Sequence, residues 1–246
     1  MSDPEFLTRP DGVRLAMRYQ PGKQPCIVFL PGYASDMLGG KAEALANWAA
    51  ARGQAMVRLD YRGCGESDGA FEDGTLANWR DDALLVINHV GARRLVLVGS
   101  SMGGWIALLL AQMLGDRVAG LIGLAAAPDF TEWGFSGAEK AVIDSQGRLE
   151  QASDYGPEPM VTTKGFWQSG QANLLLGHGI AITCPARLIQ GQCDPDVPWA
   201  TALTIARQLR SADVQVHLVK DGDHRLSRDQ DLALMLGVTG ALLESL

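Results

Sequence analysis

The sequence predicts an α/β protein with a mostly parallel sheet covered by helices on both faces. From Cys26 onward, strand patterns alternate with helical patterns, which is typical of parallel strands joined by helical crossovers. Several strand patterns are continuously apolar, as strands buried on both faces are. The chain has 246 residues, of which 47% are hydrophobic, so it can bury a substantial core. We expect one domain over residues 1–246.

The expected elements follow from periodicity and turn residues. Turn residues at Pro10-Asp11-Gly12 and Pro21-Gly22 indicate an early hairpin. Strands are predicted at Val13–Tyr19, Cys26–Leu30, Ala55–Leu59, Leu95–Gly99, Val118–Leu124, Ala186–Gln190 and Val214–Val219. Helices are predicted at Met37–Arg52, Thr75–Val90, Met102–Leu114, Ala200–Leu209 and Asp229–Leu243.

Residues 129–182 interrupt this alternation, and we interpret them as a cap segment inserted over one edge of the sheet. No strand-length apolar run fits between Pro128 and Ile182, and the stretch is too long for a plain loop. Helical spacing is visible over Thr162–Leu176. Ordinary crossover helices with packed aromatic residues are the alternative interpretation. The aromatic residues in question are Trp133, Phe135, Tyr155, Phe166 and Trp167.

Composition excludes several classes of function. The net charge of −7 disfavours nucleic-acid binding, which needs clustered Lys and Arg. The strongly apolar stretch at Trp105–Leu110 is too short to cross a bilayer, so no stable membrane insertion is expected. The opening residues MSDPEFLTRP lack an apolar core and are too acidic for a targeting segment. The four cysteines have no CxxC spacing, which favours free thiols in a reducing cytoplasm over a zinc site.

The stretch Gly99-Ser100-Ser101-Met102-Gly103 predicts a nucleophile elbow with Ser101 as its central serine. It fits G-x-S-x-G and lies between a predicted strand and a predicted helix, as such an elbow must. The nucleophile is held in a strained backbone conformation, so residues two positions away must lack side chains. A Gly/Ser turn in which a serine caps the helix is the alternative.

A serine hydroxyl needs a base to act as a nucleophile, and we expect His224 to supply it. His224 lies in the loop KDGDHRLS after the final strand, where it can reach over the carboxyl edge of a parallel sheet. The other histidines fit other roles. His89 ends a helix, His178 lies between glycines in the cap segment, and His217 lies within a strand.

The carboxylate that orients the base should lie between serine and histidine in chain order. Asp194 is preferred because it emerges first from the strand ending near Gln190, in the loop QGQCDPDVP. Two rivals remain open. Asp196 in the same loop could instead cap a helix or bond the loop backbone, and Asp129 follows the strand ending at Leu124.

An oxyanion hole needs two backbone donors. The N–H of Met102, directly after the nucleophile, is one expected donor. The other is the N–H of Tyr33, in the loop LPGYASDM after an earlier strand, where Gly32 permits a tight approach. A Pro-Gly turn without a catalytic role is the alternative.

Together these motifs resemble an α/β hydrolase over nearly the whole chain. The stretches that carry the resemblance are FLPGYASDM, LDYRGCGESDG, GSSMGGW, QGQCDPDVP and DGDHR. The chain is most similar to the branch that contains the mitochondrial palmitoyl-protein thioesterase and acyl-glucuronide-cleaving esterase, with bacterial relatives. The resemblance implies a mostly parallel eight-stranded sheet and a triad of Ser101, Asp194 and His224. Pro31 and Gln190 depart from the family, in which histidines are common there, at positions that perform no chemistry.

The loop DYRGCGESDG also matches a frequent family loop. We expect Asp60 and Arg62 to be structural there, with Arg62 paired to a neighbouring carboxylate. Cys64 is expected to be a small buried residue, because no base is evident beside it.

The expected activity is hydrolysis of carboxylic esters or acyl thioesters, of small molecules or acylated proteins, without metal or organic cofactor. The same triad serves both bond types. Phe135, Phe166 and Trp167, with Tyr33 and Met102 nearer the elbow, could line an acyl pocket, or these aromatic residues could form the core of the cap segment. Carbon–carbon bond hydrolysis or perhydrolysis on the same fold is the alternative. A non-catalytic binding module would lack a triad member.

Overall fold

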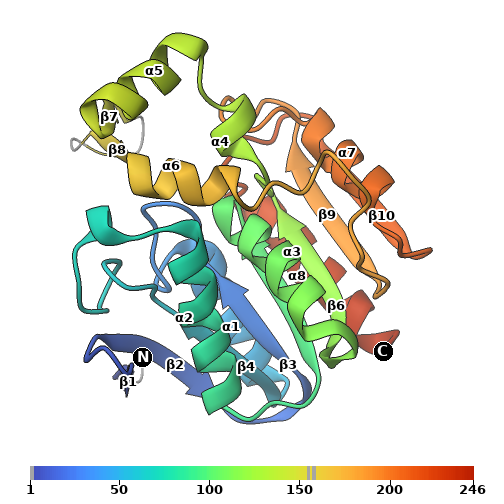
Figure 1. Cartoon of the computed structure of the whole chain (residues 1–246). Coiled ribbons are helices and arrows are strands. Elements are labelled where there is room, and N and C mark those ends of the chain that lie inside the picture. The colour runs from blue at the N-terminus through green and yellow to red at the C-terminus, as the bar shows by residue number, and fades with distance from the viewer. Residues whose placement is uncertain (1–2, 154–155, 157–158) are drawn as a thin grey trace.

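The computed structural model describes residues 3–153, 156 and 159–246, and its centre is an eight-stranded sheet flanked by helices (Figure 1). The strand order is β1-β2-β4-β3-β5-β6-β9-β10. β2 pairs antiparallel with β1 and β4, and the remaining neighbours pair in parallel. The strands are Glu5–Thr8 (β1), Arg14–Gln20 (β2), Lys23–Leu30 (β3), Gln54–Leu59 (β4), Leu95–Ser100 (β5), Val118–Leu124 (β6), Ala186–Gly191 (β9) and Val214–Val219 (β10). The predicted mostly parallel eight-stranded sheet is confirmed.

The N-terminal hairpin consists of β1 and β2. Its turn at the predicted Pro10-Asp11-Gly12 is closed by a hydrogen bond from the N–H of Arg9 to the carbonyl of Val13, at 2.9 Å. β1 was not predicted as a separate strand, because its four residues lie at the sheet edge and are mostly exposed, so they lack an apolar pattern.

Helices cover both faces of the sheet (Figure 1). α1 and α8 pack on one face, and α2, α3 and α7 pack on the other. None of the described helices is both long enough and apolar enough to cross a bilayer. The bounds are Gly40–Ala51 (α1), Leu76–His89 (α2), Met102–Leu114 (α3), Ala200–Gln208 (α7) and Asp229–Glu244 (α8), with short 3₁₀ turns at Phe71–Asp73 (η1) and Gly115–Arg117 (η2).

The start of α1 differs from the prediction. The helix begins at Gly40 rather than at Met37, because the N–H of Met37 donates to the carboxylate of Asp60, at 2.7 Å. This hydrogen bond holds residues 37–39 in the loop that follows β3, beside the carboxyl edge of the sheet.

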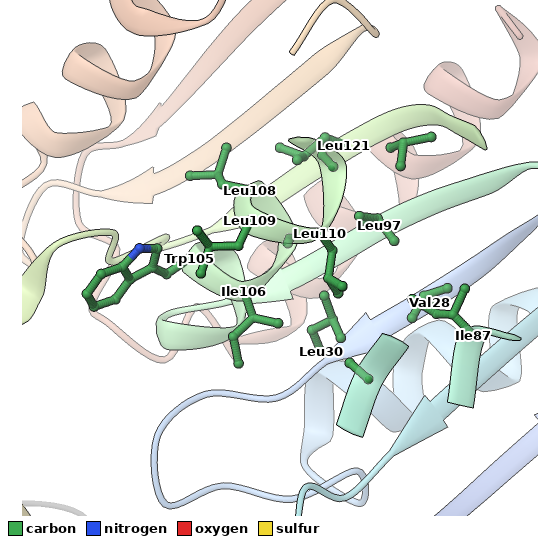
Figure 2. Packing of buried hydrophobic residues seen from close by; sticks show 14 of the residues in the cluster. Val28, Leu30, Ile87, Leu97, Trp105, Ile106, Leu108, Leu109, Leu110 and Leu121 are labelled. Atoms are coloured by element: carbon green, nitrogen blue, oxygen red, sulfur yellow. The ribbon is translucent and has the colours of Figure 1, made fainter. Parts of the chain in front are cut away.

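The core consists of two apolar layers, one on each side of the sheet. Leu95 and Leu97 of β5 face the layer beneath α2 and α3, whereas Val96 and Val98 face the layer beneath α1 and α8. This alternation is the period of two that a strand imposes. Figure 2 shows side chains of the first layer, where α3 is buried along most of its length. Packing on both faces therefore holds the carboxyl end of β5, which Ser101 directly follows.

The cap segment, residues 129–182, contains helices and a small antiparallel hairpin. Figure 1 shows α6 crossing the ends of α2 and α3. The indole N–H of Trp105 in α3 donates to the carbonyl of Asn173, at 3.1 Å. The elements are Phe130–Trp133 (α4), Gly137–Gln146 (α5), Arg148–Gln151 (β7), Met160–Thr163 (β8) and Lys164–Gln171 (α6).

Several features of the cap segment differ from the expectation. The predicted helix over Thr162–Leu176 is shorter, because the hydroxyl of Thr163 accepts the N–H of Phe166 at 3.2 Å and starts α6 there. β7 and β8 were missed because a half-exposed hairpin carries no apolar run. The aromatic residue Tyr155 lies outside the described residues.

Candidate active site

Ser101 lies at the corner between β5 and α3 with a strained backbone. Its φ of 53° and ψ of −120° place it in a region that residues with a Cβ rarely adopt. Such a conformation costs about 1–3 kcal/mol and persists only where its surroundings enforce it. The Ser101 hydroxyl makes no capping hydrogen bond to α3. This geometry is that of a nucleophile elbow rather than of a serine that caps a helix.

The glycines around Ser101 are required by close backbone contacts. A Cβ on Gly99 would lie 2.2 Å from the carbonyl oxygen of Gly103, and one on Gly103 would lie 2.1 Å from that of Leu30. A Cβ on Gly104 would lie 2.5 Å from the Cβ of Ala126. Both glycines of the motif and the one after it thus allow β5, α3 and the loop after β3 to meet at one point.

The three predicted triad residues lie in one hydrogen-bonded chain. The Oγ of Ser101 is 3.1 Å from the Nε2 of His224, and the Nδ1 of His224 is 2.9 Å from the Oδ2 of Asp194. These residues come from the ends of β5, β9 and β10, three strands whose carboxyl ends meet at the same edge of the sheet. The arrangement can activate the serine hydroxyl, because the imidazole is in reach of its proton and is oriented by a carboxylate.

The carboxylate of Asp194 is buried and accepts four hydrogen bonds. Its Oδ1 accepts the N–H groups of Asp196 and Val197, at 2.9 and 2.8 Å. Its Oδ2 accepts from His224 and from the side-chain amide of Gln190, at 2.9 and 2.8 Å. Burial opposes ionisation, but the hydrogen bonds outweigh it, so the pKa of Asp194 lies below its usual 3.8. The group therefore stays ionised at neutral pH.

The rival carboxylates have other positions. Asp129 has φ 60° and accepts the N–H groups of Leu175 and Leu176, at 2.8 and 2.7 Å, so it bonds backbone of the cap segment. Burial raises the pKa of Asp129 against these hydrogen bonds. Asp196 is exposed and donates its N–H to Asp194. Asp194 is hydrogen-bonded to His224, at 2.9 Å, as the sequence predicts for the carboxylate that orients the base.

The remaining histidines lie in the positions expected from sequence. His89 is the last residue of α2, and His178 is exposed in the cap segment. His217 lies within β10, paired in register with Ile189. None of the three is hydrogen-bonded to Ser101 among the described residues.

The two expected oxyanion donors come from segments beside the elbow. Met102 is the first residue of α3, so its N–H has no intrahelical acceptor. Tyr33 follows Gly32, at which a Cβ would lie 3.3 Å from the Cβ of Ser101. The hydroxyl of Tyr33 donates to the carbonyl of Val161 in β8, at 2.6 Å, a link to the cap segment that sequence could not indicate. The loop after β3 therefore lies directly beside the nucleophile.

Arg62 and Cys64 have the structural surroundings expected of them. Arg62 donates to the buried Asp82, with Nη2 to Oδ1 at 3.1 Å, and Arg9 donates to the same oxygen. The carboxylate of Asp60 accepts N–H groups of two loops, those of Met37 and Glu66. Burial raises the pKa of the Cys64 thiol to about 12, which keeps it protonated and unreactive.

The aromatic residues expected to line an acyl pocket pack in and around the cap segment. Phe166 is buried, and its ring centroid is 4.7 Å from that of Tyr33 and 5.4 Å from that of Trp79. The indole of Trp167 donates to the carbonyl of Thr131, at 3.0 Å, and the ring of the half-buried Phe135 lies 6.4 Å from that of Phe130. These are contacts of a packed core, and a role in binding an acyl chain stays a prediction.

One cluster of the described residues has the composition of a metal site. Asp194, Asp196 and His224 each place a ligand-type atom within 4.8 Å of the others. In this cluster, however, Asp194 and His224 are bonded to each other, and both oxygens of Asp194 accept two donors already. The cluster overlaps the predicted triad, and these hydrogen bonds occupy the Asp194 oxygens that a cation would need.

The strand order and the serine at the end of β5 define an α/β hydrolase, and the chain belongs to this family. The family model described as alpha/beta hydrolase fold matches residues 25–142. The chain is an enzyme of the ester- and thioester-hydrolysing class, as the sequence predicts.

Individual relatives place the chain within the family. It is 37% identical over 245 residues to the human mitochondrial palmitoyl-protein thioesterase ABHD10, an alignment that covers 98% of this chain and 80% of that protein. The structure of ABHD10 from mouse superposes with a TM-score of 0.92 at 34% identity, covering 99% of both chains. A putative hydrolase from Agrobacterium vitis S4 has the same TM-score at 39% identity, covering 98% of both chains. The resemblance stated from the motifs is confirmed.

The expected cytoplasmic location is wrong by this comparison. The curated ABHD10 relatives from human, orangutan, cattle, mouse and rat are all mitochondrial proteins, at 35–37% identity. The expectation rested partly on the free cysteines. Free thiols indicate a reducing compartment but do not distinguish one such compartment from another.

Proposed function

We propose that the chain hydrolyses carboxylic esters and acyl thioesters through an acyl-enzyme formed on Ser101. The observation that carries the proposal is the continuous chain of hydrogen bonds from Ser101 through His224 to Asp194. In the first half-reaction, the Oγ of Ser101 attacks the carbonyl carbon while Nε2 of His224 takes the hydroxyl proton. Asp194 orients the imidazole through Nδ1–H and stabilises its charged form.

The second half-reaction releases the acyl group. His224 gives its proton to the departing alcohol or thiol, and then takes a proton from the water that attacks the acyl-enzyme. Collapse of the second tetrahedral intermediate frees the acid and returns the proton to Ser101. The N–H groups of Met102 and Tyr33 stabilise the oxyanion in both steps, each worth about 2.7–4 kcal/mol in the transition state.

The relatives favour an S-acylated protein or a long acyl thioester as substrate. Those with 35–37% identity over nearly the whole chain are named palmitoyl-protein thioesterases. A cap segment rich in aromatic residues supports an apolar acyl group, because such side chains supply the apolar walls of ligand sites. We propose that the cap segment covers the acyl group while Ser101 reacts.

The experiment that tests this proposal compares hydrolysis of acyl esters and acyl thioesters of increasing chain length by wild type and Ser101→Ala. We expect Ser101→Ala to lose activity on every substrate, and a fluorophosphonate probe to label wild type at Ser101 only. Hydrolysis by Ser101→Ala, or turnover of a carbon–carbon substrate without ester turnover, would contradict the proposal.

A matched pair of carboxylate variants tests the acid. Asp194→Asn should lower kcat by about 10⁴-fold, because the amide leaves His224 in the wrong tautomer. Asp129→Asn makes the same change at the buried carboxylate that bonds cap-segment backbone, and should retain triad chemistry. Equal losses in the two variants would contradict the assignment of Asp194.

A further inference from the structure

Gln190 is a buried amide in contact with the triad carboxylate. It lies near the end of β9, is 1% exposed, and donates from Nε2 to the Oδ2 of Asp194, at 2.8 Å. The same nitrogen lies 3.3 Å from the carbonyl oxygen of Val197. Both neighbours are acceptors, so the amide nitrogen must face them and the orientation of the side chain is defined.

The other end of this amide has no protein partner. The Oε1 of Gln190 is buried without a hydrogen bond among the described residues. A buried acceptor without a partner lowers stability, and an apolar side chain of the same size would avoid that loss. Departures of this kind occur where a side chain serves the site rather than the stability of the fold.

The amide shares its acceptor with the catalytic base. The Oδ2 of Asp194 receives both the Nε2–H of Gln190 and the Nδ1–H of His224. A donor on that oxygen withdraws negative charge from the bond to His224 and fixes the plane of the carboxylate. The amide does not titrate, so this donor acts at every pH at which the fold is stable.

We infer that Gln190 is a positioning residue that sets both the orientation and the basicity of Asp194, and through it the pH range over which His224 acts as base. The inference rests on the proposed function. It differs from the expectation drawn from the family motifs, in which this position performs no chemistry, because the amide bonds the reacting chain directly.

The test uses Gln190→Met, which keeps the length of the side chain and removes the donor, with Gln190→Leu as a second variant. The control is Gln208→Met, which removes an amide that donates to the carbonyl of Leu176, at 3.1 Å, away from the triad. Measurements are kcat, the pH profile of kcat/KM and the melting temperature.

We expect Gln190→Met to lower kcat by about 3- to 10-fold, as the loss of one hydrogen bond does. The acidic limb of kcat/KM should move up by roughly 0.3–1 pH unit, because Asp194 then stabilises the protonated imidazole more strongly. The melting temperature should stay equal or rise, since the unpaired Oε1 is gone. Gln208→Met should leave the limb unmoved.

Two results overturn the inference. An acidic limb that stays in place in both Gln190 variants would show that the amide does not act on Asp194. A fall in melting temperature as large as that of Gln208→Met, again without a shift of the limb, would show a structural bond only. Failure of the proposed function is distinguishable, because wild type itself would then show no hydrolysis above Ser101→Ala.

Discussion

Tyr33→Phe is predicted to weaken both the fold and the catalytic step. Tyr33 follows the tight approach at Gly32, carries a proposed oxyanion donor on its backbone, and bonds the carbonyl of Val161 in the cap segment through its hydroxyl, at 2.6 Å. Its ring contacts Phe166 and Trp79 edge-on or tilted. The substitution deletes the hydroxyl together with its hydrogen bonds to β8, and keeps these ring contacts.

The magnitude follows from the loss of the hydrogen bonds that the hydroxyl makes to Val161 and Thr162 in a partly buried place. We expect the free energy of unfolding to fall by about 1–2 kcal/mol, because the carbonyl of Val161 loses its donor. For a chain of this size each kcal/mol corresponds to about 2–4 °C, so the melting temperature should fall by about 2–8 °C. The value of kcat should also fall, since the loop that carries the oxyanion donor is no longer tied to β8.

The assay is scanning calorimetry with hydrolysis of a chromogenic ester on the same samples. Tyr19→Phe on β2 is the control, because it makes the same change on a ring that packs against the core from the sheet rather than from the loop beside the cap segment. A Tyr33→Phe enzyme with the melting temperature and kcat of wild type would refute the reasoning. A loss of stability with unchanged kcat would refute the link between the cap segment and the oxyanion loop.

Three further predictions concern the elbow, a half-buried lysine and a buried carboxylate. Gly103→Ala should abolish activity and lower the free energy of unfolding by at least about 1–3 kcal/mol, because its Cβ would lie 2.1 Å from the carbonyl oxygen of Leu30. The control is Gly137→Ala, whose Cβ meets nothing within 4 Å and should change neither activity nor stability. Burial lowers the pKa of Lys41 from 10.5 to about 8, so the unfolded chain binds more protons than the folded one between these pH values. The free energy of unfolding of wild type should therefore rise by up to about 3 kcal/mol between pH 8 and 10.5. Lys41→Met should lose this rise, as measured by denaturant titrations at alkaline pH. Asp82→Asn should lower the free energy of unfolding in urea by about 3 kcal/mol, because it removes the buried carboxylate that Arg9 and Arg62 share and leaves them only the exposed Asp11.

Each of these has an outcome that contradicts it. Full activity of Gly103→Ala would mean that the elbow can relax around a methyl group. A rise in stability between pH 8 and 10.5 that persists in Lys41→Met would assign the titration to another group. An unfolding midpoint of Asp82→Asn equal to that of wild type would mean that the arginines are solvated rather than held by Asp82.

The positions of Ser101, Asp194 and His224 beside one another could be predicted from sequence, the first from a local motif and the other two from the strands that they follow. Ser101 needs glycines on both sides and a strand-to-helix boundary, and all three are visible in consecutive residues. Asp194 and His224 each follow a strand with a strong apolar pattern, so their place at the carboxyl edge follows from topology alone. The sheet order then brings together residues that are far apart in the chain.

The cap segment and the contacts around the triad could not be predicted in the same way. α4 and β7 are only four residues long, too short to show a period. α5 could have been found, because Ser136 and Glu139 form a capping box that is visible as a spacing in the sequence. The bond from Tyr33 to Val161 joins residues 128 positions apart, and no local pattern indicates it.

The side chain of Asp129 joins the two ends of the cap segment. Its carboxylate, near the start of the segment, holds the backbone of Leu175 and Leu176 near the end. The polypeptide therefore leaves the α/β core and returns to it at one junction, which a single carboxylate fastens. The hydrogen bond from Tyr33 to Val161 also ties this segment to the loop beside Ser101, so a change in the length of the segment would act on the surroundings of the nucleophile as well.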